Sequence, residues 1–469
     1  MEKNKLGKHS NNQDQNEQLS FFDELEQSDE TDSIESTAPS KERMSDYQIV
    51  DDFIRFVNCL LEQNVYLTKT REYISRKFLP NINCQLSVQN DAATINSEQH
   101  YYPYIHLLFH LAIASKIFKK VSGQAGNKSL QVTERLNLFH ELTDTEKYYF
   151  LLETFWIDVD WDDLQDQAYQ SVAQTLQELF IVLTKDHPVY ANLLQEVDYT
   201  DDVLGSELFD WHYFLLFFEW FGLWVTEPDH QAIKSDGIKK SYYAKTLTIT
   251  EFGEQVIPIL LFERNLQFWN ITLRWKYGEV NALPGSIPEH FIFLLPEDVE
   301  SNFPKFTEGK SPELFLQSFK KCYPNKALQK SLPRRLSRFV NGQYIFKVFL
   351  TDGVWRSVVL SGQHTMEDLH EIIIHAYDFS DDHLYSFFLD GKRWSEFQVV
   401  SPLEHFGYIT ADKVKIGELG LDVGQSFMYL FDYGAEWTFT VVLEHLHEQV
   451  TTIMRPFIKE SRGSGPHQY

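Results

Sequence analysis

The order of apolar and polar positions divides the chain into a helical part and a later part that is rich in strands. Between 46 and 270 most apolar residues recur with helical spacing. A helix is predicted over 47–63, another after the threonine–aspartate capping signal at 143–144, and a third over 164–183. The first of these places its apolar stripe on Ile49, Phe53, Phe56, Val57 and Leu60.

Two stretches of the helical part, 104–139 and 211–257, share one order of elements. Each has an apolar helix, a short strand, a polar loop, a second strand and the start of another helix. Thr133 and Thr250 stand where that last helix begins, and a threonine hydroxyl there can accept a hydrogen bond from a free N–H of the first turn. This order is typical of a winged helix, so the sequence predicts a tandem of two winged-helix-like units.

Beyond position 340 the pattern changes to the alternation of strands. Segments 344–350 and 355–360 alternate, and turn-forming residues separate them, which predicts a hairpin. An amphipathic helix capped by Thr365 follows, then a strand over 383–391 and two strands joined by the turn DYGAEW. The predicted fold class is α+β and multidomain, with a mostly α-helical middle that holds the winged-helix-like units and a C-terminal ubiquitin-like (β-grasp-like) domain.

Composition sets the domain boundaries. The first 45 positions are polar and acidic, and such a segment cannot bury enough apolar area to offset the entropy of ordering. Proline-bearing segments after position 270 indicate an irregular connector. The predicted organisation is a disordered acidic tail (1–45), a helical region with the two units (46–270), a connector (271–335), an α+β domain (336–450) and a flexible tail (451–469).

The chain has 469 residues and a formal net charge of -26, so its surface on average repels phosphate and favours basic partners. Its three cysteines show no paired spacing, which predicts reduced thiols. The N-terminus lacks the apolar segment of a signal peptide, and the longest apolar run, 213–225, is shorter than the roughly 20 residues of a membrane-spanning helix. We therefore expect a cytoplasmic protein with no membrane partner.

Motifs for catalysis and for cofactors are missing from the sequence. It contains no phosphate-binding loop, no dinucleotide fingerprint and no nucleophile elbow. Several histidines lie between 364 and 447, but none has the spacing of a metal site, and His370 and His375 fall on different faces of the predicted helix. No catalytic residue, no cofactor and no metal is predicted.

Three ordered motifs stand out after position 340. They are LHEIIIHA at 369–376, HLYSF at 383–387 and YLFDYGAEW at 429–437. Together they resemble the plasmid pRiA4b ORF-3-like family, which also carries an insertion-sequence passenger (TnpR-type) name. The resemblance implies a ubiquitin-like fold and no assigned activity. Its resolvase-derived name does not carry over, because a serine recombinase needs a nucleophilic serine among arginines and no arginine cluster stands here.

The same region is markedly acidic, with 17 acidic and 6 basic residues between 340 and 450. Asp381 and Asp382 lie near the second motif, and Ala435 stands where the family has a second acid in the turn of the third, which weakens any cation or basic-peptide site there. Trp394 offers a further aromatic anchor. The candidate partner-binding residues are His383, Tyr385, Asp432, Tyr433, Glu436 and Trp437.

An alternative interpretation assigns these residues to the structure alone. Asp432 then stabilises the tight turn through its side chain, and Trp437 belongs to the core.

A lysine-rich loop in the second winged-helix-like unit gives a different candidate surface. Its residues combine phosphate-gripping lysines with rings that stack on bases: Lys239, Lys240, Tyr242, Tyr243 and Lys245. The alternative is a solvated loop without such a role. The preceding helix is apolar almost all round, so we expect it to be buried and unable to reach base edges.

Three functional hypotheses follow. The leading one is a non-enzymatic cytoplasmic interaction or adaptor protein with a protein partner, a basic one by charge. The alternative is a nucleic-acid-binding regulator associated with mobile elements, although the net charge disfavours nucleic acid as a partner. The third is an unrecognised hydrolase centred on Asp432, Glu436 and His383.

Overall fold

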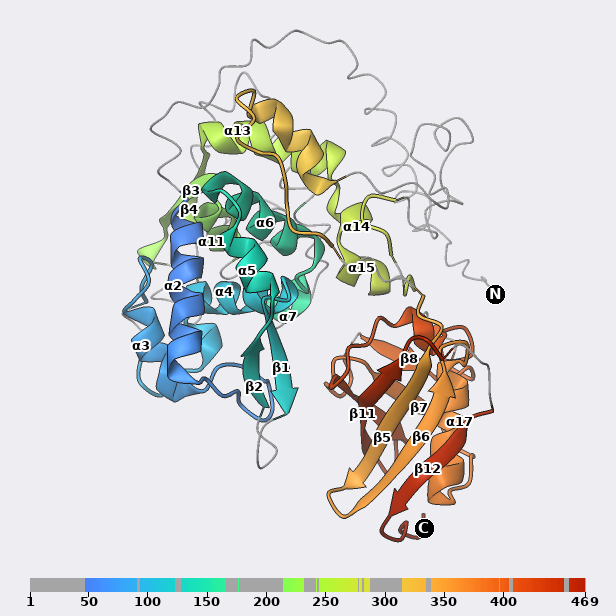
Figure 1. The fold of residues 1–469 in the computed structure, drawn as a ribbon. Coiled ribbons are helices and arrows are strands. Elements are labelled where there is room, and N and C mark those ends of the chain that lie inside the picture. The colour runs from blue at the N-terminus through green and yellow to red at the C-terminus, as the bar shows by residue number, and fades with distance from the viewer. Residues whose placement is uncertain are drawn as a thin grey trace, which may run out of the picture.

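A helical body and a body built on one large sheet make up the computed structural model (Figure 1). The predicted acidic tail and most of the helix expected over 164–183 lie outside the described residues. The structure describes 47–90, 93–122, 128–165, 176, 214–231, 242, 244–276, 278–280, 282–286, 314–334, 339–395, 397–404, 408–450 and 455–468.

The helical body has one continuous apolar core, and the predicted stripe of the first helix is buried in it. Thr143 caps the start of α6, as the sequence predicts, and Glu146 completes a capping box with it. The helices of this body are α2 (Gln48–Gln63), η2 (Arg76–Phe78), α3 (Leu79–Asn83), η3 (Gln99–Tyr101), α4 (Pro103–Ala114), α5 (Arg135–His140), α6 (Asp144–Ile157), α7 (Trp161–Gln165), α11 (Phe214–Trp220), α13 (Glu251–Pro258), η6 (Ile259–Glu263), α14 (Leu266–Trp269), α15 (Ile271–Lys276) and η8 (Phe315–Cys322).

Both predicted units contain a helix, an antiparallel hairpin and a second helix. In the first unit, α4 leads into β1 (Phe118–Ser122), β2 (Lys128–Val132) and α5. In the second, α11 leads into β3 (Trp224–Pro228), β4 (Ala244–Ile249) and α13. The predicted order of elements is therefore confirmed in both.

The two units also agree in local detail. The hydroxyl of Thr133 donates to the carbonyl of Lys116, and that of Thr250 donates to the carbonyl of Gly222. Lys116 and Gly222 both have positive φ, 59° and 79°. Each threonine oxygen also accepts from an N–H of the following turn, at 3.2 Å in the first unit and 2.9 Å in the second. The predicted capping role is confirmed for Thr250, the N-cap of α13. The N-cap position of α5 is Glu134, which makes no side-chain cap, and the side-chain oxygen of Thr133 accepts only from the N–H of Arg135.

The C-terminal body is a mixed α+β domain, as predicted at that level. Its strands lie in the order β12-β6-β5-β11-β10-β7-β8-β9, and all neighbours are antiparallel except β8 and β9. The elements are β5 (Gln343–Thr351), β6 (Val354–Ser361), α17 (Met366–Tyr377), β7 (Tyr385–Phe388), β8 (Gln398–Val400), β9 (Ile409–Thr410), η9 (Ile416–Glu418), β10 (Ser426–Phe431), β11 (Trp437–His447) and β12 (Phe457–Arg462).

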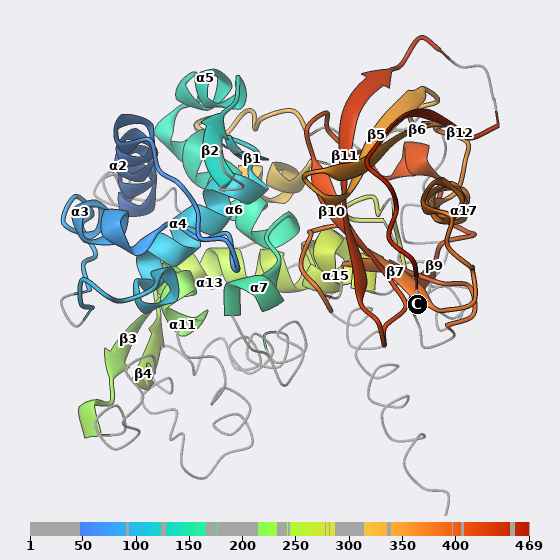
Figure 2. The same ribbon diagram turned by 90° about the horizontal axis from the view of Figure 1, so that it is seen from below.

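Helix α17 covers one face of this sheet and supplies part of the domain core (Figure 2). Thr365 caps it by accepting from the N–H of Asp368 at 3.2 Å, and the Asp368 carboxylate accepts from the N–H of Thr365 at 2.7 Å. Leu369 and Ile373 are completely buried against the strands. The predicted cap and inward face of this helix are confirmed.

The expectation of a flexible tail from position 451 needs correction. Strand β12 pairs with β6 from Phe457 opposite Val359 to Arg462 opposite Trp355. Most of its side chains are exposed, so it lacks the alternation of apolar residues that marks a half-buried strand. Its place in the sheet therefore depends on backbone hydrogen bonds to β6, and its side-chain pattern does not predict a strand.

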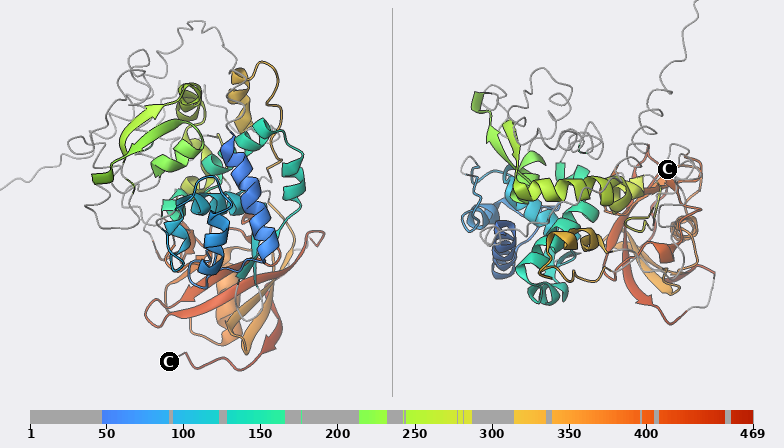
Figure 3. Two further views of the ribbon diagram at one scale, coloured as in Figure 1. Left: turned by 90° about the vertical axis from the view of Figure 1, so that its left-hand side faces the viewer. Right: turned by 90° about the horizontal axis from the view of Figure 1, so that it is seen from above.

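The segment expected as a connector packs against both bodies. Arg334 forms ion pairs with Glu153 and Asp158 of the helical body. Trp275, on α15, belongs to the core of the C-terminal body and stacks on Phe397 at 5.3 Å between ring centroids. In the right-hand view of Figure 3 the yellow-green helical segment that includes α15 runs from the helical body toward the C-terminal body. Among the described residues, no helix has the length and apolarity needed to cross a membrane.

Candidate functional site

The structure separates the predicted partner-binding residues onto the two faces of the sheet. Tyr385 points toward α17, where its ring stacks on that of His370 with 3.7 Å between centroids. Ser386 points the opposite way, because successive side chains of a strand alternate. The hydroxyl of Tyr433 lies 2.7 Å from that of Ser386, so Tyr433 is on the second face.

Asp432 and His383 lie close to the first face. One oxygen of Asp432 accepts from the N–H groups of Gly434 and Ala435, at 2.9 and 3.1 Å, and the side chain is buried. The second oxygen lies 3.7 Å from a ring nitrogen of His383. Asp432 thus stabilises the turn, as the alternative interpretation predicts, and position 435 contributes its backbone N–H to this arrangement.

The remaining predicted residues lie elsewhere. Glu436 forms an ion pair with Arg393 at 2.7 Å. Trp437 packs its ring on Phe379, with 5.0 Å between centroids. Trp394 is 54% exposed and packs edge-on against Tyr433. Trp437 thus packs against the domain core, and neither it nor Glu436 nor Trp394 lines a site with His383 and Tyr385.

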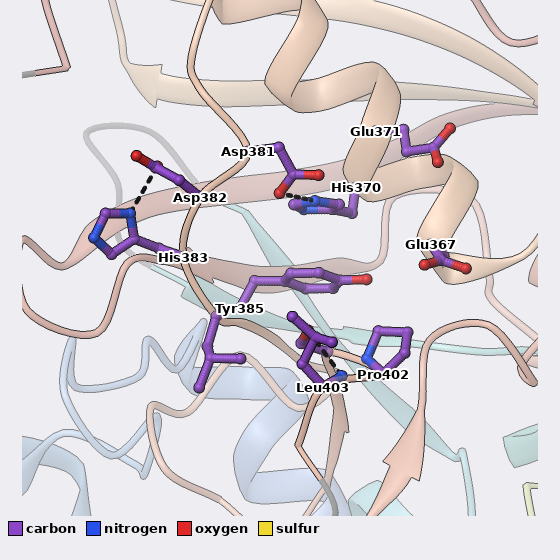
Figure 4. A pocket seen from close by; sticks show the side chains of 11 residues that line it. Glu367, His370, Glu371, Asp381, Asp382, His383, Tyr385, Pro402 and Leu403 are labelled. Atoms are coloured by element: carbon purple, nitrogen blue, oxygen red, sulfur yellow. Dashed lines mark hydrogen bonds and ion pairs between the residues drawn. The ribbon is translucent and has the colours of Figure 1, made fainter.

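A pocket of about 390 Å³ opens where the first turns of α17 meet the segments around positions 382 and 402 (Figure 4). Four carboxylates and two histidines line it, and no lysine or arginine does. Leu403 is 77% exposed and forms an apolar rim with Pro402. The lining residues are Glu367, His370, Glu371, Asp381, Asp382, His383, Leu384, Tyr385, Ser401, Pro402 and Leu403.

His370 holds one wall of the pocket in place. One ring nitrogen lies 2.6 Å from the hydroxyl of Tyr429, and the other lies 3.0 Å from Asp381. Burial lowers the pKa of His370, and the nearby Asp381 carboxylate only partly opposes that change. The ring is therefore neutral at neutral pH and does not offset the charge of the carboxylates.

Tyr385 supplies a polar atom at the base of the pocket. It is 4% exposed, and its hydroxyl has no hydrogen-bond partner among the described residues. Figure 4 shows the ring beneath His370, with the hydroxyl on the side of Glu367. Burial and the carboxylates of Glu367 and Asp381 raise the pKa of Tyr385, so the group stays a neutral hydroxyl.

Negative charge is concentrated around this hydroxyl. Burial raises the pKa of Glu367, and the carboxylates of Asp412 and Glu371 add to that effect. Asp382 contacts a ring nitrogen of His383 at 2.8 Å on the outer side. A cation that entered the pocket would therefore gain electrostatic energy from several carboxylates at once.

Residues 344–468 match the model of the family described as plasmid pRiA4b ORF-3-like protein. The C-terminal body is a pRiA4b ORF-3-like domain. A protein of unknown function from Methanosarcina mazei is similar at 20% identity, over 27% of this chain and 71% of that one, with a TM-score of 0.23. No curated protein matches the chain.

Among the acidic and histidine residues that line the pocket of the pRiA4b ORF-3-like domain, Glu367, His370 and Glu371 were not predicted as site residues from the sequence. One signal for them is local. Glu367 and Glu371 are four positions apart on one helix, an arrangement of like charges that destabilises a helix. A site that uses both charges gives a reason for such a pair. The pocket itself joins three segments that are distant in sequence, so spacing alone could not reveal it.

The nucleic-acid candidates are only partly described. Lys239, Lys240 and Tyr243 lie outside the described residues, and Lys245 is placed on β4 by its backbone. The hydroxyl of Tyr242 lies 2.6 Å from that of Thr226, so this half-buried ring has a partner within the unit.

Helices α4 and α11 are buried in the apolar core. The prediction that the second unit's helix is buried is thus confirmed for most of 214–220. Within the described part of the chain, no group of three or more His, Cys, Asp or Glu side chains is placed to hold a metal ion.

Proposed function

We propose that this chain is a non-enzymatic interaction protein, and that the acidic pocket of its pRiA4b ORF-3-like domain binds a basic segment of a protein partner. The observation that carries the proposal is the pocket's charge: four carboxylates line it and no lysine or arginine does. A net charge of -26 extends the same preference over the molecule and steers cations toward it.

The pocket's position also supports binding to a partner. Glu371, Asp381 and Asp382 are exposed, so a partner can approach them without local unfolding. The apolar rim at Leu403 gives a contact that excludes water from one side. A charged pocket beside an apolar rim is suited to a side chain that carries both kinds of surface.

Binding of a basic peptide tests this proposal directly. The probe is a fluorescein-labelled peptide of glycine, lysine and arginine, titrated with the full-length protein at two salt concentrations. We expect affinity to fall with salt, because the attraction is screened. The double variant Glu371→Gln, Asp382→Asn should bind about tenfold more weakly, since each exposed charge pair contributes about 0.5–1 kcal/mol.

The matched control is Asp352→Asn with Glu460→Gln. It removes the same amount of charge from exposed positions of the domain outside the pocket. No binding at low salt, or an equal effect of both double variants, would contradict the proposed function.

The other hypotheses receive less support. The buried helices of the two units favour a role in packing or protein docking over base readout. For the hydrolase hypothesis, Asp432 is held in a turn and Glu436 is held by Arg393. The winged-helix-like description of the units and the ubiquitin-like description of the C-terminal domain stay predictions.

A further inference from the structure

We infer that the pocket recognises a primary alkylammonium, supplied by a lysine side chain of the partner, and that the hydroxyl of Tyr385 accepts one of its hydrogen bonds. This inference rests on the proposed function, because it names the group that the basic segment inserts. It adds a hydrogen bond to Tyr385 and a preference for lysine over arginine, neither of which the proposed function requires.

The Tyr385 hydroxyl lacks a hydrogen-bond partner in the described part of the chain. It is buried and it lines the pocket. An unsatisfied buried hydroxyl destabilises the folded state, and a phenylalanine of nearly the same shape would avoid that cost. A ligand that donates a hydrogen bond to this oxygen gives a reason for tyrosine at this position.

The groups around the hydroxyl also favour a ligand that donates hydrogen bonds. Carboxylates only accept hydrogen bonds when ionised, so a pocket lined by them selects a ligand that donates. An ammonium group has three donors and no acceptor. Glu367, Asp381 and Tyr385 come from the helix, from the segment after it and from β7, so the acceptors reach the pocket from different directions.

That arrangement distinguishes lysine from arginine. A guanidinium is planar and is best bound by one carboxylate in a two-pronged contact, whereas an ammonium is a compact charge with donors in several directions. Pro402 and Leu403 form an apolar edge of the pocket, and the exposed Leu403 can cover the methylene chain of a lysine. A volume of about 390 Å³ leaves room for that chain to enter.

Ligand-observed NMR with the full-length protein tests the inference on three small probes. These are the Nα-acetyl amides of lysine, arginine and norleucine, the last of which keeps an alkyl chain without the charge. We expect the lysine probe to bind, the arginine probe to bind several-fold more weakly, and the norleucine probe not to bind. In Tyr385→Phe the affinity for the lysine probe should fall about tenfold, the effect of one hydrogen bond to a charged group.

Tyr433→Phe is the matched control, because it removes a hydroxyl from the same domain outside the pocket. A thermal melt of Tyr385→Phe separates binding from folding. We expect its midpoint to equal or exceed that of the wild type, since the lost hydroxyl has no described partner. Spermidine is the fourth probe, and tighter binding of spermidine than of a lysine-containing peptide would overturn the assignment to a protein lysine.

Two results distinguish failure of this inference from failure of the proposed function. Equal binding of the lysine and arginine probes, with no effect of Tyr385→Phe, would overturn the inference while binding of the basic peptide still supported the proposed function. Absence of binding by the basic peptide and by every small probe would overturn both.

Discussion

A single backbone contact decides which residue the second helix–hairpin–helix unit accepts at position 253. A Cβ on Gly253 would lie 1.9 Å from the carbonyl oxygen of Leu223, so α13 can approach the start of β3 only with glycine there. The first unit has Leu136 at the matching distance from its threonine. There Thr133 accepts from the N–H of Arg135, one residue earlier than in the second unit, so its helix starts differently.

Replacement of this glycine should therefore destabilise the helical body. We expect Gly253→Ala to lower the free energy of unfolding by about 3 kcal/mol, the scale of overpacking against a fixed backbone. Urea denaturation followed by tryptophan fluorescence measures it. Gly353→Ala is the control, because a Cβ there meets nothing within 4 Å. Equal stability of the two variants would contradict the close approach.

At the scale of elements, α17 links folding to the pocket. Its first turn carries Glu367, and the cap on that turn is the Thr365 hydroxyl, which accepts from the N–H of Asp368. The cap and the strands β5, β6, β10 and β11 follow from local patterns, and the sequence predicts them correctly. Strand β12 does not follow from a local pattern, because this exposed edge strand is specified by its pairing with β6 more than by its side chains.

The cap gives a second stability prediction. We expect Thr365→Ala to lower the free energy of unfolding by about 1 kcal/mol and to weaken binding at the pocket, because the turn that positions Glu367 frays. Hydrogen exchange of the first amides of α17 reports the fraying. Thr365→Ser keeps a hydroxyl and should retain most of both properties, so an equal loss in the serine variant would refute the capping role.

At the scale of the whole molecule, an ionic cluster joins the two bodies. Lys392, from the C-terminal domain, pairs with Asp163 of α7, and His110 of α4 lies 3.9 Å from the same carboxylate. Burial lowers the pKa of His110 to about 4, although Asp163 opposes this and Lys392 and Lys120 reinforce it. Burial acts to raise the pKa of Asp163, but its cationic surroundings hold it at about 2. Because His110 is neutral at neutral pH, Lys392 is the main cation beside Asp163.

This cluster predicts a loss of stability in mild acid. The folded pKa of His110 lies below its ordinary value of 6.5, so its contribution is complete above that pH and is lost as pH falls toward 4. A shift of this size corresponds to at most about 3 kcal/mol. We expect the drop in melting temperature between pH 7 and pH 5 to be smaller in His110→Gln. The exposed His375→Gln is the control, and an equal reduction there would contradict the assignment.

The pocket shows why sequence alone predicts elements better than sites. His383 and Tyr385 lie in a recognisable motif, and the structure brings both to the pocket. Tyr433 and Glu436 lie in an equally recognisable motif and fall outside the pocket, because the turn between β10 and β11 carries them to Ser386 and Arg393. Three-dimensional pairing decides which of the motif residues meet.

The insertion of Trp275 into the C-terminal core limits how far this domain is a separable module. The family match begins at residue 344, yet Trp275, which lies well before that point in the sequence, is part of the core. A gene fragment cut at the family boundary leaves that indole behind and exposes Phe397 to water. The folded domain therefore includes a residue that the family match leaves out. Transfer of this domain to another protein would require a replacement for the Trp275 ring.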